Sequence, residues 1–339
     1  MNSLNPKKAT SLALVLAAVA LTAAACSGSD DGVTSASCSG VPTGLAPGGT
    51  GPDAYTLMLR VNTGKQVEQF AAGSLRSRIR DRDIFMIDTE YEKIDSGQTV
   101  SIFNKLKSEF PCNRVMSLNG LLKTPGKPGY MYALAGEQGL DAVILDWEKE
   151  TWEETGGAPW SEDSAVNENR MAREVESVAD RIAENPGSAD TRVGLATQFR
   201  PGWNYAAFGR RLARINSKLN DKFIGYQVVQ SQDRCKGTPD SASLAQLARG
   251  IRSQYRKGQV SGGNSDLDSL THLGFEISFS TDSKSGAVEA AGRDSPGDGA
   301  SCTAEVLKIG GAAFIYWATP TAIEAMLETA AGKKFRPAS

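Results

Sequence analysis

Short apolar runs alternate with longer amphipathic stretches along the chain from residue 54 onward. The runs are rich in Val, Ile, Leu and aromatic residues, which is typical of strands buried on both faces. Eight such runs are present, at 54–61, 83–89, 114–119, 141–147, 191–197, 222–230, 273–280 and 311–318. The stretches between them repeat apolar residues at helical spacing. They predict helices at roughly 64–80, 97–110, 129–139, 164–185, 203–219, 239–257, 302–309 and 320–331.

Eight strands alternating with helices over about 280 residues predict a (β/α)8 TIM barrel of the α/β class, whose usual size is about 250 residues. A doubly wound open sheet is the alternative. That fold usually carries a Gly-rich phosphate-binding turn after its first strand. The turn here is Asn62-Thr63-Gly64-Lys65, which lacks the G-x-G-x-x-G spacing, so the barrel is favoured.

Residues 1–25 are predicted to be a signal peptide. Lys7 and Lys8 precede a short apolar run, and three small residues then lead to Cys26. This ending resembles a bacterial lipobox, which implies cleavage before Cys26 and a diacylglyceryl thioether on its sulfur. Cleavage without a lipid is the alternative. We therefore expect an exported lipoprotein, anchored to the cell membrane and facing its extracytoplasmic side.

Residues 26–53 are predicted to be a flexible tether between the lipid and a barrel domain that spans 54–339. Of the 27 residues after Cys26 in this segment, 18 are Gly, Ser, Thr or Pro, a composition typical of linkers.

Four further cysteines follow Cys26, and export would place them in an oxidising compartment. Cys38, Cys112, Cys235 and Cys302 can form two disulfides in three connectivities. We favour Cys38–Cys112, which pins the tether to the domain, and Cys235–Cys302, which clips a long loop.

The charge balance excludes several classes of function. The chain has 37 Lys and Arg residues against 39 Asp and Glu residues, so a nucleic-acid partner is not expected. His272 is the single histidine, which leaves no multi-His zinc site. We expect no metal, no cofactor and a monomer. The basic run from Arg76 to Arg82 is interleaved with acids, which is typical of a solvated face.

Polar residues gather where the predicted strands end, which is where barrel enzymes carry their catalytic groups. The set combines carboxylates, amides and an indole, a mixture typical of a sugar site. Its members are Asp88, Glu90, Ser117, Asn119, Asp146, Glu148, Gln198, Arg200, Gln227, Gln230, Gln232, Asp233, Ser280, Asp282 and Trp317.

The fourth predicted strand ends in two carboxylates, Asp146 and Glu148. Strand alternation puts both on one face together with Ile144. Like-charge repulsion favours protonation of one acid beside an ionised partner, as glycosidic cleavage requires. A pair of solvated acids capping the next loop is the alternative.

The stretch from Gly139 to Glu148 resembles the D-x-x-D-x-D-x-E signature of family-18 glycoside hydrolases, the chitinases and endo-β-N-acetylglucosaminidases. Asp141, Asp146 and Glu148 match three of its four acids, and Ile144 replaces the other. The third predicted strand is similar to that family's S-x-G-G, with Asn119 at its first Gly. Trp317 is similar to the family's tryptophan under the sugar ring.

The resemblance implies substrate-assisted hydrolysis. Glu148 would be the general acid and then the base, and Asp146 would orient the substrate's acetamido group. Substrate-binding candidates are Ser117, Asn119, Trp152, Trp203, Gln230 and Trp317. The sixth strand lacks the family's Met-x-Tyr-Asp, and the fourth strand also resembles family-114 polygalactosaminidase-like barrels. If the site instead uses a nucleophilic carboxylate, Glu276 is the candidate, although it lies early in its predicted strand.

These expectations combine into a surface-anchored, glycosidase-like barrel that cleaves glycans containing N-acetylhexosamine. A non-catalytic carbohydrate-binding lipoprotein on an inactive barrel is the alternative from another class, motivated by Ile144 and the altered sixth strand. A surface scaffold without a ligand is the third hypothesis. Fold likeness alone does not decide among them.

Overall fold

The structure of the 339-residue chain is a computed structural model, which describes the placement of part of the residues. These are Cys38, 55–88, 96–120, 140–147, 191–198, 223–230, 272–277, 296–310, 312–315 and 318–338, with the single positions 166, 167, 169, 170, 173, 180, 210, 253 and 257.

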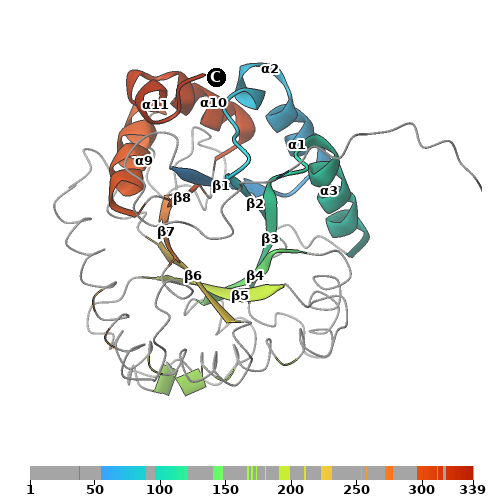
Figure 1. Ribbon diagram of the computed structural model, residues 1–339, viewed down its shortest axis with the longest axis vertical. Coiled ribbons are helices and arrows are strands. Elements are labelled where there is room, and N and C mark those ends of the chain that lie inside the picture. The colour runs from blue at the N-terminus through green and yellow to red at the C-terminus, as the bar shows by residue number, and fades with distance from the viewer. Residues whose placement is uncertain are drawn as a thin grey trace, which may run out of the picture. The chain divides into compact units, whose positions relative to one another are not determined.

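Eight parallel strands close into a barrel in which each strand pairs with its neighbours in chain order and β8 pairs with β1 (Figure 1). The strands are β1 Thr56–Val61, β2 Ile84–Asp88, β3 Arg114–Gly120, β4 Ala142–Trp147, β5 Arg192–Gln198, β6 Phe223–Gln230, β7 His272–Ile277 and β8 Ala312–Ile315. All eight predicted strands are therefore confirmed. The closed strand order makes this a TIM-barrel-like α/β fold and excludes the open doubly wound sheet.

The described helices flank the part of the barrel around β7, β8, β1 and β2 (Figure 1). They are α1 Gly64–Ala71, α2 Gly73–Arg76, α3 Ser96–Glu109, α9 Pro296–Gly310, α10 Pro320–Glu328 and α11 Ala330–Phe335. The predicted helix 64–80 is thus two short helices, because the chain turns at Gly73 with φ of +58°. The predicted helix 320–331 is likewise divided at Thr329, which ends α10 and caps α11.

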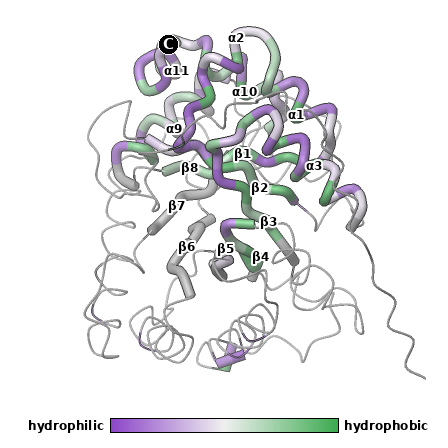
Figure 2. The backbone as a smooth tube through the Cα atoms, turned by 45° about the vertical axis from the view of Figure 1, so that its right-hand side comes forward, coloured by the Kyte–Doolittle hydropathy of each residue, from purple (hydrophilic) through white to green (hydrophobic). Residues whose placement is uncertain are grey.

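The barrel interior is filled by apolar side chains from alternate strand positions. This alternation identifies the barrel-facing positions of each strand. The interior cluster comprises Met58, Ile84, Met86, Met116, Leu118, Ala142, Ile144, Ala196, Ala312 and Phe314. Figure 2 shows the hydrophobic colour along β2, which contributes two of these residues.

A second core lies between the barrel wall and the helices. Phe85 of β2 points outward and stacks edge-to-face on Phe70 of α1, with ring centroids 5.7 Å apart. On its other side Phe110, which follows α3, approaches Phe85 to 4.7 Å between centroids. Aromatic pairs in this geometry add to the free energy gained from burial, so these rings fix α1 and α3 against β2.

The amino end of the barrel is closed by a buried ion pair between Asp83 and Arg336. Asp83 precedes β2 and also accepts hydrogen bonds from the backbone N–H groups of Leu57 and Arg80, at 2.8 and 2.9 Å. Arg336 follows α11, and its Nη2 atom lies 2.8 Å from Asp83 and donates to the carbonyl of Tyr55 at 3.2 Å. The end of the chain is thereby fastened to the start of β1 and β2.

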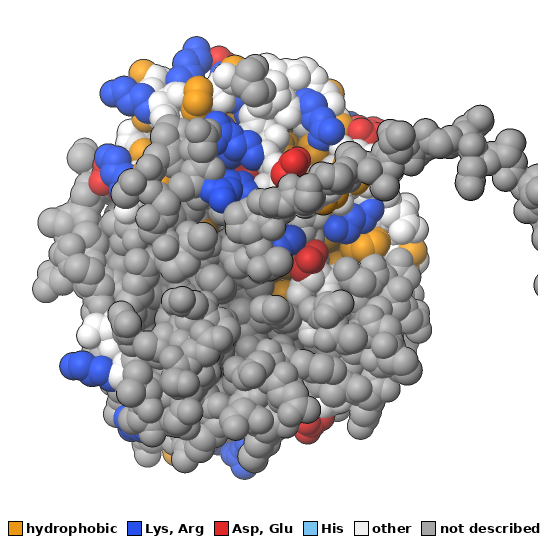
Figure 3. All heavy atoms as spheres, in the orientation of Figure 1, with side chains coloured by type: hydrophobic (Ala, Val, Ile, Leu, Met, Phe, Trp, Pro, Cys, Tyr) orange, Lys and Arg blue, Asp and Glu red, His pale blue; other side chains and the backbone are white. Residues whose placement is uncertain are grey.

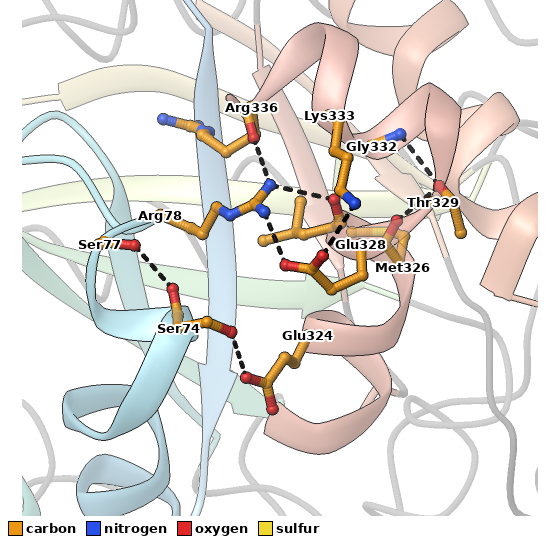
Figure 4. Close-up of polar contacts among 11 residues, drawn as sticks. Ser74, Ser77, Arg78, Glu324, Met326, Glu328, Thr329, Gly332, Lys333 and Arg336 are labelled. Atoms are coloured by element: carbon orange, nitrogen blue, oxygen red, sulfur yellow. Dashed lines mark hydrogen bonds and ion pairs between the residues drawn. The ribbon is translucent and has the colours of Figure 1, made fainter. Parts of the chain in front are cut away.

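A second arginine extends this network toward the helices. Arg78 donates from Nη1 to the carbonyls of Leu327 and Arg336, and from Nη2 to the carboxylate of Glu328 (Figure 4). Glu328 also pairs with Lys333 at 3.1 Å. The Lys333 hydrogen bond, together with the charge of Arg78, lowers the pKa of Glu328. Arg78 therefore joins the loop before β2 to both C-terminal helices.

The predicted disulfide Cys38–Cys112 is present, with a Cα–Cα distance of 5.3 Å. Cys112 lies between α3 and β3, so the bond attaches the tether segment at the amino end of the barrel. Cys302, buried in α9, is also disulfide-bonded. Cys235 and Cys26 lie outside the described residues.

We predict that Gly332→Ala destabilises the domain. A Cβ atom at Gly332 would lie 2.3 Å from the carbonyl oxygen of Met326 and 2.6 Å from the Cα atom of Leu327, both in the backbone of α10. Helix α11 must therefore shift, at a cost of about 2 kcal/mol in the free energy of unfolding. Urea denaturation measures this loss.

Gly64→Ala is the matched control, because a Cβ at Gly64 meets only the flexible side chain of Lys105 at 3.5 Å. We expect this variant to be as stable as the parent or slightly more stable. Equal losses in the two variants would contradict the close packing of α11 on α10.

Candidate functional site

The carboxyl ends of the eight strands form one end of the barrel, which is where enzymes of this architecture place their chemistry. The barrel-facing positions become polar towards this end. On β1, Arg60 is the next residue on the same face after the interior residue Met58. On β2, Asp88 is the next residue on the same face after the interior residues Ile84 and Met86. Because Arg60 pairs in register with Met86, these charged residues lie next to each other above the apolar interior.

Arg60 and Asp88 form an ion pair in which Arg60 Nε lies 2.6 Å from Asp88 Oδ2. The Asp88 side chain is fully buried and that of Arg60 is 12% exposed. Removing two charges from water is costly unless each finds its partner and further hydrogen bonds. The ion pair with Asp88 therefore fixes the Arg60 guanidinium at the carboxyl end of the barrel interior.

The turn after β1 supports this arginine. In the amide orientation that satisfies both of its polar atoms, Asn62 accepts from Arg60 Nη2 at 2.9 Å and donates to the Val61 carbonyl at 3.1 Å. The side chain of Gln66 accepts from the Asn62 backbone N–H at 2.6 Å, while Thr63 caps α1. Thr63 and Gln66 form a capping box, which starts α1 almost immediately after β1 and fixes the turn that holds Arg60.

Strand β4 carries the predicted acid Asp146 next to its last residue, Trp147. Ala142 and Ile144 both belong to the interior cluster, so Asp146 occupies the next barrel-facing register position, between Gly120 of β3 and Ala196 of β5. The side chain of Asp146 and all of Glu148 lie outside the part of the chain that the structure describes.

Asp141, the first acid of the family-like motif, lies at the opposite end of β4. Its Oδ2 atom accepts from the backbone N–H of Val115 at 2.8 Å, and its own N–H donates to the Val115 carbonyl at 2.9 Å. These bonds align the start of β4 with β3. Asp141 therefore has a structural role far from the carboxyl end.

The strands on the far side of the barrel add further polar positions. Gln198 ends β5 and pairs in register with Gln230, which ends β6, and Gln230 pairs with Glu276. Glu276 is the penultimate residue of β7, which ends at Ile277. Residues 278–280 of the predicted strand lie outside the described residues, so the place of Glu276 within the full predicted strand stays a prediction.

The remaining predicted site residues fall into two groups. Ser117 is fully buried on β3 and pairs with Ile87 and Val143, which alternate with the interior residues, so it faces the helices. Asn119 shares that alternation, two residues later on the same strand. Outside the described residues lie Glu148, Trp152, Trp203, Trp317 and the lipidation candidate Cys26.

Sequence reasoning missed Arg60. Arg60 stands within an apolar run, and the run as a whole predicts a strand without distinguishing this residue from its neighbours. The available signal was its spacing: Met58 and Arg60 share one face of a strand buried on both sides, where a charge needs a partner. Asp88, which was among the strand-end acids, is that partner.

Within the described ranges, no group of three or more His, Cys, Asp or Glu side chains is arranged to hold a metal ion. None of the described helices is long and apolar enough to span a membrane.

Comparisons with known proteins add little beyond the fold. No family model matches this chain, and no curated protein matches it. The chain is similar to the crystal structure of orotidine 5'-phosphate decarboxylase from Pyrococcus horikoshii OT3, with 13% sequence identity and a TM-score of 0.42. The match covers 83% of this chain and 99% of that chain. The fold is assigned here from the closed strand order, and this similarity assigns no function.

We predict that Asp88→Leu lowers the free energy of unfolding by about 3 kcal/mol, because it leaves the Arg60 guanidinium buried without its counter-charge. The double variant Arg60→Leu with Asp88→Leu removes both charges and should recover most of that loss. Urea denaturation of both variants measures the difference. A double variant no more stable than Asp88→Leu alone would contradict a mutually dependent pair.

Proposed function

We propose that this protein is a surface-anchored glycoside hydrolase that cleaves glycans containing N-acetylhexosamine, with Glu148 as general acid and base and Asp146 as its partner. The proposal combines the sequence of the fourth strand with the position of that strand in a closed parallel barrel.

The register of β4 is the observation that carries the proposal. Ala142 and Ile144 lie in the barrel interior, and Asp146 stands two residues further along β4, in register with Ala196 of the same interior cluster. Glu148 follows two residues later in the sequence. Carboxylates at this end of a parallel barrel are in the usual location for catalysis.

In the proposed reaction, Glu148 protonates the oxygen of the leaving sugar while the substrate's own acetamido oxygen attacks the anomeric carbon. Asp146 orients that acetamido group and stabilises the positive charge that develops on it. Glu148 then takes a proton from the water that opens the cyclic intermediate. Substrate-assisted hydrolysis needs no second nucleophilic carboxylate from the protein.

A second reaction type is suggested by the acid Glu276, which lies within β7. Its register partners are Gln230 and Phe314, and Phe314 belongs to the interior cluster. In a two-carboxylate retaining mechanism, Glu276 would be the nucleophile and Glu148 the acid. A substrate without an acetamido group distinguishes the two routes, since only the carboxylate nucleophile can act on it.

The burial of Ile144 favours the binding alternative. This residue stands where the family-like motif has its middle acid, and it is fully buried in the apolar interior. Asp146 therefore has no acid two positions before it on its own strand with which to share a proton. A barrel that binds glycans without cleaving them is consistent with this substitution.

The test is release of dye from a panel of fluorogenic glycosides, including N-acetylglucosamine oligomers, by residues 27–339. This chain retains every contact described here, because the described unit begins at Cys38. We predict that Glu148→Gln lowers kcat by about a thousandfold, through loss of the proton donor. Glu276→Gln should leave acetamido substrates nearly unaffected.

Asp141→Asn is the matched control, because it removes a carboxylate of the same motif that bonds to Val115 at the other end of β4. We expect this variant to keep its kcat even if its unfolding midpoint falls. Glycan binding by the parent and Glu148→Gln alike, without dye release by either, would refute the hydrolase and leave the binding lipoprotein.

A further inference from the structure

Two basic segments that lie about 250 residues apart in the sequence meet at the amino end of the barrel. One is the loop region from Arg76 to Arg82, and the other is the C-terminal stretch from Lys333 to Arg336. Arg78 joins them through its hydrogen bond to the Arg336 carbonyl at 2.8 Å. Figure 4 shows this junction, with Lys333 and Glu328 beside it.

The charges of the two segments act on one another. Burial lowers the pKa of Arg336, Asp83 opposes this shift, and the nearby charges of Arg80 and Arg82 lower the pKa further. The cations of the loop are therefore close enough to the C-terminal segment to contribute to one electrostatic field.

The described segments at this end of the barrel carry an excess of positive charge on a chain whose net charge is −2. Segments 72–83 and 329–338 hold seven Lys and Arg residues against two Asp residues. Counting Glu324 and Glu328 of α10 as well still leaves an excess of three positive charges.

The cations that reach solvent define what we call the basic surface. Its members are Arg76, Lys333 and Lys334, which are exposed, and Arg80 and Arg82, which are half-buried. Figure 3 shows Lys and Arg side chains gathered over the region of α2, α10 and α11.

The tether is attached beside the same surface. Asn113, which follows the disulfide-bonded Cys112, donates from its side chain to the Arg80 carbonyl at 2.7 Å. The Arg76 guanidinium lies 4.2 Å from the ring centre of Phe110, two residues before Cys112. The disulfide therefore fixes Cys38 next to these cations.

We propose that the basic surface docks on an anionic phospholipid membrane, so that the amino end of the barrel faces the lipid and the carboxyl ends of the strands face away from it. The 12 residues from Cys26 to Cys38 span at most about 40 Å when fully extended, which keeps this end near the membrane. The orientation of the barrel relative to the membrane rests on the lipid anchor of the proposed function. The binding of the basic surface to anionic lipid does not depend on that anchor.

Vesicle sedimentation tests the docking with residues 27–339, which lack the lipidation site. We expect binding to vesicles of phosphatidylglycerol and phosphatidylcholine in equal parts, no binding to phosphatidylcholine alone, and weaker binding as salt is added. Lys333→Gln with Lys334→Gln should lower the partition coefficient about tenfold, since each cation near an anionic surface contributes to binding.

Lys65→Glu is the control, because it changes the net charge by the same two units at an exposed position on α1, near the carboxyl end of β1. It should change the partition coefficient by less than about twofold. Equal binding to both vesicle types, no binding to either, or equal losses in the two variants would overturn the proposal. Glycoside release on the same preparations reports separately on the proposed function, since vesicle binding requires neither Glu148 nor a lipid anchor on Cys26.

Discussion

The buried pair of Asp83 and Arg336 is the interaction on which the described part of the domain depends. Asp83 uses both carboxylate oxygens, binding Leu57 and Arg336 with one and Arg80 with the other. Both side chains are completely buried, so neither charge could remain there without the other. This pair holds the starts of the first two strands and the last residues of the chain in one place.

The two ends of the barrel use charge in different ways. At the amino end, Asp83, Arg78 and Arg336 bind mainly backbone groups and one another, so their role is to hold elements together. At the carboxyl end, Arg60 and Asp88 lie above the apolar interior and bind side chains across two strands. Stability at one end and chemistry at the other is the division typical of this architecture.

The sequence predicted all eight strands because parallel strands buried on both faces leave long apolar runs that stand out from their surroundings. It did not predict the break of the helix at Gly73, because a positive φ is a local backbone choice that periodicity does not record. The basic surface could not be predicted from the sequence either. The run from Arg76 to Arg82 has the pattern of a solvated face, and only the folded chain brings Lys333 and Lys334 beside it. Contacts across about 250 residues leave no pattern in either segment alone.

The register of the barrel shows that the interior still contains a charged residue although Ile144 stands where the family-like motif has an acid. Ile144 pairs with Leu118, and Leu118 pairs with Asp88, so the buried Asp88 stands in the same register row two strands away. Neighbouring strands are about 4.8 Å apart, which puts Asp88 roughly 10 Å along that row. Its carboxylate forms an ion pair with Arg60 of the neighbouring strand at 2.6 Å. The middle position of the β4 motif therefore contributes an apolar side chain to the interior, and the buried charge in that row is Asp88, held by a counter-charge on the neighbouring strand.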